Sequence, residues 1–337
     1  DLCNPEVRQY VIDQMTKVFS SGDVRYVKWD MNRIFSDIYA PSLPAKQQGE
    51  TAHRYVLGLY QIMKELTTRF PEILFEGCSA GGNRFDLGIL CYFPQIWASD
   101  NTDALCRTEI QNSYSYGYPL STFTAHVSSC PNHQTLRITP LETRFQVASF
   151  GVLGYECNLR DLPGSDLKAI REQITLYKKW REVFQFGTFY RGMENDDSDL
   201  EALSWTCVSK DGRRAVGMFF QRLATPNQPH DWYRPAGLLP DVKYHFYGRN
   251  IKYNLKDFGD LVNTVSPVHI KQGSALQEIL SKLVTMDGEK EDLTAYGNTL
   301  MRAGVALKPA FAGTGYNSDT RLFPDFSSRI YFMEAVE

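Results

Sequence analysis

The chain has 337 residues and a formal net charge of −3, with 43% hydrophobic and 22% charged residues. This length allows two domains of ordinary size, and the composition is that of a soluble globular protein. Nucleic acids and anionic membranes bind surfaces with clustered Lys and Arg, so the absence of a basic excess argues against both as partners and favours a neutral ligand.

The first half of the chain predicts alternating helices and strands. Asn4 is placed to cap a helix that begins at Pro5 and continues, by its apolar spacing, to Gly22. A second amphipathic helix is predicted over residues 50–70. Short apolar runs around these helices predict strands over residues 24–29, 73–76, 95–99, 122–127 and 151–156.

A helix over residues 165–184, with Ser165 or Asp166 as its cap, closes this alternation. Repeated strand-then-helix units imply a parallel sheet wrapped by helices. Five strands are visible in the sequence, whereas a closed (β/α)8 barrel needs eight. We therefore expect an α/β fold with an incomplete TIM (β/α)8 barrel over residues 1–186. Its open edge would be covered by a partner segment, by self-association or by rearrangement.

Residues 187–337 show a different pattern. Alternating runs over residues 204–208 and 215–220 flank the turn signal Lys210-Asp211-Gly212-Arg213 and predict a hairpin. Further predicted strands, among many Gly and Pro residues, cover residues 244–247, 302–307 and 329–332. We expect this part to form an antiparallel β-sandwich domain.

The lack of a recognisable targeting signal and the cysteine pattern lead us to expect a cytoplasmic protein. The sequence has no apolar run of the ~20 residues that a membrane-spanning helix needs, and residues 1–5 lack the basic and apolar regions of a signal peptide. The seven cysteines form an odd set without a Cys-x-x-Cys pair. Reduced thiols are therefore favoured over a disulfide framework.

Two predicted strands of the first half end in a carboxylate. The run Lys28-Trp29-Asp30-Met31-Asn32-Arg33 places Asp30 after the first strand, and Ile96-Trp97-Ala98-Ser99-Asp100-Asn101-Thr102-Asp103 places Asp100 after the third. The carboxyl ends of the strands meet at one end of such a barrel, where active sites lie. Two carboxylates at that end are the minimum equipment for cleaving a glycosidic bond.

These two runs belong to a longer pattern. It continues through Gly77-Cys78-Ser79-Ala80-Gly81-Gly82, then His126-Val127-Ser128, Pro131-Asn132-His133-Gln134 and residues 139–145. The pattern resembles the α-galactosidases of glycoside hydrolase family 36, densely over the first half of the chain and loosely over the second. The resemblance implies that residues 1–186 are about strands 4 to 8 of the barrel of a longer protein, and that residues 187–337 are its C-terminal β-domain.

The resemblance also implies a retaining exo-α-galactosidase acting on raffinose-type and melibiose-type sugars. Asp30 would be the nucleophile and Asp100 the acid/base, with apolar neighbours favouring the protonated form of Asp100. Lys28, on the same strand face as Asp30, would favour the ionised nucleophile. The alternative for Asp30 is a turn cap. The alternative acid is Asp103, which would otherwise hold Arg107 or a neighbouring loop.

Galactose contacts are implied by the same resemblance for five residues: Lys28, Asn32, Cys78, Gly81 and Trp97. For Trp97, and equally for Trp29, packing in the core is the alternative to stacking on a sugar ring. No cofactor or metal is implied, because His126, Cys130 and His133 match no zinc-ligand spacing. The glycine-rich run from Gly77 also lacks the Lys-Ser/Thr ending of a phosphate loop.

Two other functions stay open at this point. Capture of the galactosyl-enzyme by a sugar instead of water would make the protein a galactosyl-transferring transglycosylase. A chain without the first barrel strands would alternatively be an inactive carbohydrate-binding or structural piece. The resemblance further implies a homo-oligomer, a tetramer in the complete protein.

Overall fold

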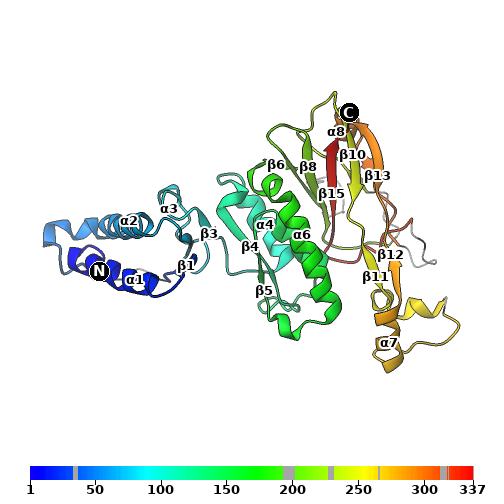
Figure 1. Cartoon of the computed structure of the whole chain (residues 1–337), viewed down its shortest axis with the longest axis horizontal. Coiled ribbons are helices and arrows are strands. Elements are labelled where there is room, and N and C mark those ends of the chain that lie inside the picture. Colours follow the sequence, from blue (N-terminus) through cyan, green and yellow to red (C-terminus); the bar gives the residue numbers. More distant parts are fainter. Residues whose placement is uncertain are drawn as a thin grey trace. The chain divides into compact units, whose positions relative to one another are not determined.

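The computed structural model describes residues 1–32, 37–192, 202–226, 231–264, 266–311, 317 and 319–336. The chain forms two compact units, one of residues 1–102 with 121–125 and the other of residues 103–120 with 126–337. Figure 1 labels the helices and strands of both units.

The first unit is built on short parallel strands and two long helices. Its elements are α1 (Pro5–Ser20), β1 (Tyr26–Asp30), α2 (Thr51–Arg69), β2 (Leu74–Cys78), α3 (Leu87–Leu90), β3 (Gln95–Trp97) and the first half of β4 (Phe123–Ser128). The Asn4 side chain accepts a hydrogen bond from the Glu6 amide and caps α1, as predicted. Strands β1 to β4 pair in chain order, and all three pairings are parallel.

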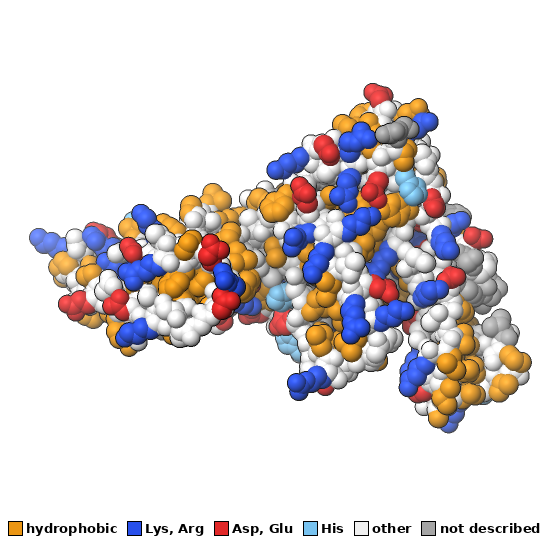
Figure 2. Space-filling view, in the orientation of Figure 1, with side chains coloured by type: hydrophobic (Ala, Val, Ile, Leu, Met, Phe, Trp, Pro, Cys, Tyr) orange, Lys and Arg blue, Asp and Glu red, His pale blue; other side chains and the backbone are white. Residues whose placement is uncertain are grey.

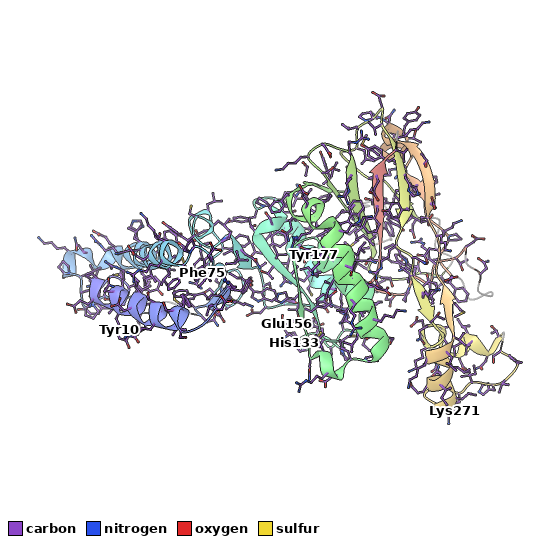
Figure 3. The ribbon with its side chains drawn as sticks, in the orientation of Figure 1. Tyr10, Phe75, His133, Glu156, Tyr177 and Lys271 are labelled. Carbon is purple, nitrogen blue, oxygen red and sulfur yellow. The ribbon has the colours of Figure 1, made fainter. Side chains whose placement is uncertain are left out.

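One face of these strands packs against α1 and α2, which lie side by side in Figure 1. The layer between helices and strands is apolar and buried, with Ile12, Leu66, Phe75 and Ile96 among its residues. Figure 3 shows Phe75 inside this layer and Tyr10 on the outer side of α1. Because neighbouring residues of a strand face opposite sides, the residues on either side of Phe75 and Ile96 form a second, separate face of the sheet.

The second unit begins with elements that continue the alternation of strands and helices. They are α4 (Ala104–Tyr114), the second half of β4, α5 (Leu141–Ser149), β5 (Val152–Glu156) and α6 (Gly164–Phe186). The strand order is β1-β2-β3-β4-β5, so the five predicted strands form one sheet. The predicted cap of α6 is wrong. Pro163 is its N-cap residue and makes no side-chain hydrogen bond, while Ser165 and Asp166 lie inside the first turn. Their side chains are therefore one to two residues too late to act as the cap.

An antiparallel sheet of six strands follows α6. In sheet order, these strands are β13 (Asp292–Tyr296), β10 (Lys243–Gly248), β15 (Ser327–Ala335), β8 (Arg214–Gln221), β7 (Ala202–Val208) and β6 (Thr188–Arg191). The predicted hairpin is β7 with β8, in which Val208 lies opposite Ala215. The unit also contains smaller elements, among them β9 (Trp232–Tyr233) with β14 (Val305–Ala306), β11 (Lys252–Asn254) with β12 (Thr285–Asp287), α7 (Ala275–Leu283) and α8 (Gly297–Arg302).

The strand predicted over residues 302–307 is only partly correct. Arg302 is the last residue of α8, and only Val305 and Ala306 pair as β14. Gly304 has a φ of +80°, a left-handed conformation that ends helices. This glycine separates the helical turn from the strand, which the alternation of apolar residues alone did not reveal.

The surface carries both signs of charge. Figure 2 shows Lys and Arg side chains interspersed with Asp and Glu over the visible face. Within the described ranges, no helix combines the length and the apolar content needed to cross a membrane.

Candidate active site

The polar face of the first unit's sheet carries the predicted site. Lys28 and Asp30 lie on this face of β1, two residues apart. The pairing of β1 with β2 places Lys28 opposite Glu76 and Asp30 opposite Cys78. This orientation is fixed because Phe75, the neighbour of Glu76, packs among the helices on the other face. A cation, a thiol and two carboxylates therefore gather where two neighbouring strands end.

Asp30, the predicted nucleophile, is exposed at the end of β1. Its Oδ2 atom accepts a hydrogen bond of 2.9 Å from Asn32 Nδ2. Burial first, and then the hydrogen bond of the thiol with Asp30, raise the pKa of Cys78 to about 11. The thiol is therefore protonated at neutral pH and donates to the carboxylate. Two neutral donors thus hold Asp30, and no ion pair of Asp30 is found among the described residues.

Asp100, the predicted acid/base, follows β3 on a loop. Its Oδ1 atom accepts a hydrogen bond of 2.8 Å from Trp97 Nε1. Trp97 is buried, and Lys28 Nζ lies 4.3 Å from the centroid of its ring, close enough for a cation–π attraction. The indole therefore connects Lys28 on β1 with Asp100. The predicted enclosure of Asp100 by apolar neighbours is not seen, because its side chain is exposed and meets the polar edge of Trp97.

The turn after β2 lies between these two groups. Gly81 has a φ of +83°, and a Cβ atom on it would lie only 2.9 Å from Ser99 Cα and 3.2 Å from Asp100 N. On its other side, the N–H of Ala80 donates a hydrogen bond to Asn32 Oδ1. The turn is therefore packed, backbone to backbone, against the loop of Asp100, which requires glycine at this position.

The structure thus brings all seven predicted site residues into one set of contacts at the ends of β1, β2 and β3. They are Lys28, Asp30, Asn32, Cys78, Gly81, Trp97 and Asp100. All seven belong to the first unit.

The two tryptophans differ in their surroundings. Trp29 belongs to the apolar layer under the helices, and its ring centroid lies 6.0 Å from that of Phe93. Packing, not sugar stacking, is therefore its role. Trp97 faces the polar side of the sheet, with Lys28 over its ring and Asp100 at its nitrogen. The strand face thus decides for packing in the case of Trp29, whereas Trp97 lies on the face of the site and its sugar contact stays a prediction.

Asp103, the alternative acid, has a structural position in the second unit. It is buried, accepts a hydrogen bond from the Cys106 amide as the N-cap of α4, and lies 2.6 Å from both Arg137 Nη1 and Thr135 Oγ1. Burial alone would raise the pKa of Asp103, but the hydrogen bonds from Thr135 and Cys106 and the charge of Arg137 outweigh it and lower the pKa. Asp103 is therefore ionised at neutral pH and holds a neighbouring loop.

A polar network on the same sheet face, buried except for Tyr26, escaped prediction. Tyr26 Oη donates to Glu76, while Gln95 Nε2 donates to Tyr26 Oη and to Thr124 Oγ1, each at 2.9 Å. Burial and the neighbouring Glu76 raise the pKa of Tyr26. The signal in the sequence was the position of Glu76 two residues before Cys78, in a strand that otherwise reads as apolar.

Arg84 also escaped prediction. Its guanidinium donates to the carbonyl oxygen of Cys78 and, at 3.4 Å, to that of Trp29. Burial lowers the pKa of Arg84. Arg84 thus bridges the final residues of β1 and β2 behind the site.

His126 has a carboxylate neighbour on β5. No group of three or more His, Cys, Asp or Glu side chains in the described ranges is placed to hold a metal ion. His126 Nδ1 instead lies 3.0 Å from Glu156 Oε2, near the end of β5 where Figure 3 labels Glu156. Gly154 leaves room for this imidazole, because a Cβ atom there would lie 2.4 Å from His126 Cδ2.

Comparison with known proteins shows the family of this chain. Residues 1–187 match the melibiase family, and residues 202–333 match the glycosyl hydrolase family 36 C-terminal domain. Alpha-galactosidase AgaA of Geobacillus stearothermophilus is 44% identical over 251 residues, 74% of this chain and 34% of that protein. Alpha-galactosidase Mel36A of Lactobacillus acidophilus is 47% identical over 244 residues, 72% of this chain and 33% of that protein. The chain spans about a third of the length of these relatives.

Solved structures show the same likeness. The α-galactosidase from Lactobacillus brevis matches with a TM-score of 0.80 and 35% identity, over 100% of this chain and 39% of that one. A variant of AgaA from Geobacillus stearothermophilus, solved in complex with raffinose, matches with a TM-score of 0.79 and 37% identity over the same shares. A parallel sheet followed by antiparallel sheets is thus similar to family 36 structures. Because the melibiase match covers more than half of its residues, the chain belongs to the melibiases of glycosyl hydrolase family 36.

Proposed function

We propose that the complete protein is a retaining exo-α-galactosidase that hydrolyses terminal α-D-galactosyl residues of raffinose-type and melibiose-type sugars. The observation that carries this proposal is the set of contacts linking Asp30, through Asn32 and the turn at Gly81, to the loop of Asp100. Relatives that are α-galactosidases, one of them solved with raffinose, support the substrate class.

The mechanism that fits two such carboxylates has two steps. First, Asp30 attacks the anomeric carbon while Asp100 gives its proton to the glycosidic oxygen, so the bond to the leaving sugar breaks and a galactosyl-enzyme forms. Then Asp100, now a carboxylate, takes a proton from water, whose oxygen attacks the same carbon and releases Asp30. The exposure of both side chains supports these roles, because among the described residues neither carboxylate has an ion pair that must break before it meets a substrate.

Five residues would bind the galactose: Lys28, Asn32, Cys78, Gly81 and Trp97. A sugar hydroxyl both donates and accepts hydrogen bonds, so a pocket for a neutral sugar needs mixed polar groups beside an apolar wall. The ammonium of Lys28, the amide of Asn32 and the thiol of Cys78 supply the polar groups, and Trp97 supplies an aromatic surface. The two-carboxylate chemistry requires neither metal nor cofactor.

The architecture of the complete protein is also a proposal. Residues 1–186 would be about strands 4 to 8 of a (β/α)8 barrel, with β1 pairing with a further barrel strand, and residues 187–337 a C-terminal β-sandwich domain. The ranges of the two family matches support this division. All seven cysteines are free thiols, which supports a cytoplasmic location. A homotetramer is the assembly proposed from the family resemblance.

The test is release of nitrophenol from p-nitrophenyl α-D-galactopyranoside by the complete protein and by its Asp30→Asn variant. Loss of the nucleophile should lower kcat by at least about 10³-fold, and NMR should show α-galactose as the first product. An Asp30→Asn variant with wild-type turnover would refute the assignment. The product ratio at high acceptor sugar then separates hydrolysis from transfer. The same assay on residues 1–337 alone shows whether this chain assembles a working site.

A further inference from the structure

Asn32 uses both ends of its side-chain amide within the protein. Its Nδ2 atom donates to Asp30 Oδ2 at 2.9 Å, and its Oδ1 atom accepts from the N–H of Ala80. An amide is the one side-chain group of this size that donates a hydrogen bond at one end and accepts a hydrogen bond at the other. Asn32 therefore matches a carboxylate on one side and a backbone N–H on the other.

The turn that receives Asn32 has an unusual backbone. Ala80 has a φ of +43°, which costs a residue with a Cβ atom about 1 kcal/mol or more. The turn is held in this shape by hydrogen bonds to the end of β1. Ser79 Oγ donates to the carbonyl of Met31 at 2.9 Å, and the N–H of Met31 donates to the carbonyl of Cys78 at 3.1 Å.

The far side of the turn touches the loop of the second carboxylate. Gly81 lies so close to Ser99 and Asp100 that a Cβ atom would be 2.9 Å from Ser99 Cα. Any outward shift of the turn would therefore move this loop. Asn32 and the turn thus form a continuous brace from the Asp30 carboxylate to the backbone of Asp100.

A second connection links β1 with the Asp100 loop, and it runs across the polar face of the sheet. Lys28 lies over the Trp97 ring, and the Trp97 nitrogen donates to Asp100. This path fixes where the Asp100 side chain points, whereas the brace fixes where its backbone lies. A retaining glycosidase needs its two carboxyl groups about 5 to 5.5 Å apart, so both position and direction matter.

We propose that Asn32 is a positioning residue that sets the separation between Asp30 and Asp100 by tying the Asp30 carboxylate to the turn at Ala80 and Gly81. The inference rests on the proposed function of these two carboxylates, and it differs from a sugar-binding role for Asn32. A sugar ligand acts on the substrate directly. A positioning residue acts through Asp30 and through Gly81, whichever hydroxyls the substrate carries.

The experiment uses the complete protein with Asn32→Asp, Asn32→Ala, Gly81→Ala and the double variant of Asn32→Ala with Gly81→Ala. Asn32→Asp keeps the shape and the acceptor for Ala80 but loses the donor to Asp30, so it tests the brace even where Asn32→Ala folds poorly. Asn83→Ala, an exposed amide on the same turn, is the matched control. Each variant is assayed with p-nitrophenyl α-D-galactopyranoside and with its monodeoxy analogues.

Both Asn32 variants should lower kcat on the order of 10²-fold, because small misplacements of reacting groups have effects of this size, and this loss should exceed any rise in KM from a lost sugar contact. The loss should persist with every monodeoxy substrate. In the double variant the losses should not multiply, because both substitutions break the same brace. Asn83→Ala should keep wild-type kcat.

Three results would overturn the proposal. A rise in KM at unchanged kcat, cancelled by removal of one sugar hydroxyl, would make Asn32 a sugar ligand only. Losses that multiply in the double variant would show that Asn32 and Gly81 act independently. Absence of galactosidase turnover from the wild-type complete protein would defeat the proposed function itself and this inference with it, a result distinct from the other two.

Discussion

Two carboxylates at the candidate site of the first unit have different neighbours from a buried carboxylate of the second unit. In the first unit, Asp30 and Asp100 are exposed and accept hydrogen bonds from a side-chain amide and an indole. In the second unit, Asp231 is buried, and its Oδ2 atom lies 2.6 Å from Arg321 Nη2. A guanidinium neutralises the charge of a carboxylate and fills its hydrogen-bonding positions. A neutral donor leaves the charge of the carboxylate available to a substrate. The kind of neighbour therefore separates carboxylates that stabilise the fold from carboxylates that are free to react.

A second buried pair in the antiparallel region follows the structural pattern. Arg329 contacts Glu289 and also donates to the carbonyl of Leu322 at 2.7 Å. Burial alone would lower the pKa of Arg329, but the charge of Glu289 outweighs it and raises the pKa. The Arg329 guanidinium therefore keeps its charge although it is buried.

The largest effect is expected from replacing Asp100, one of the two exposed carboxylates of the site. Asp100→Ala in the complete protein should lower kcat for melibiose on the order of 10³-fold, because the leaving sugar then departs without a proton. Aryl galactosides with acidic leaving groups should lose far less, since they need little acid assistance. The measurement is kcat for both substrate types, and an equal loss on both would show that Asp100 is not the acid.

Breaking a buried pair tests the other side of the comparison. Arg329→Met leaves Glu289 buried without its cation and should reduce the free energy of unfolding by about 3–5 kcal/mol, measured by urea denaturation. The control is Arg25→Ala, because the pair of Arg25 with Asp23 is 64% and 80% exposed and should contribute less than about 1 kcal/mol. Similar costs for the two variants would contradict the distinction between buried and exposed pairs.

The contribution of Asp103 to the free energy of unfolding should depend on pH. Its pKa is lowered in the folded chain, so its stabilisation is complete above the pKa of an unfolded Asp, near 4, and is lost as the pH falls through the lower folded value. Asp103→Asn should reduce the free energy of unfolding by about 1.5–3 kcal/mol at pH 7. Urea denaturation of both proteins between pH 7 and pH 3 should show this difference shrinking in acid, and a constant difference would refute the assignment.

The smallest effect concerns thiol reactivity. The raised pKa of Cys78, about 11, and its burial should make it slow to alkylate at pH 7, while the exposed Cys91 reacts readily. Iodoacetamide labelling followed by mass spectrometry should rank Cys91 ahead of Cys78 and show the rate at Cys78 rising toward pH 11. Fast labelling of Cys78 at pH 7 would mean that its thiol is not held protonated beside Asp30.

The sequence predicted the strand–helix alternation and the place of both carboxylates, because each ends a short apolar run. Asp30 follows β1 directly, and Asp100 lies three residues after β3. The environment of Asp100 was not predictable, since its exposure and its bond to Trp97 depend on the direction of a loop. The double role of the Asn32 amide depends on the left-handed backbone of Ala80, which no spacing of residue types encodes.

The polar network of Tyr26, Glu76, Gln95 and Thr124 crosses four neighbouring strands. Side chains alternate between the two faces of a strand, so a slip of one residue in pairing would turn Glu76 toward the helices, where Phe75 now packs. An unpaired carboxylate in that layer would cost several kcal/mol. This polar network therefore disfavours wrong strand registers during folding, since only the register that assembles the site gives these groups hydrogen-bond partners.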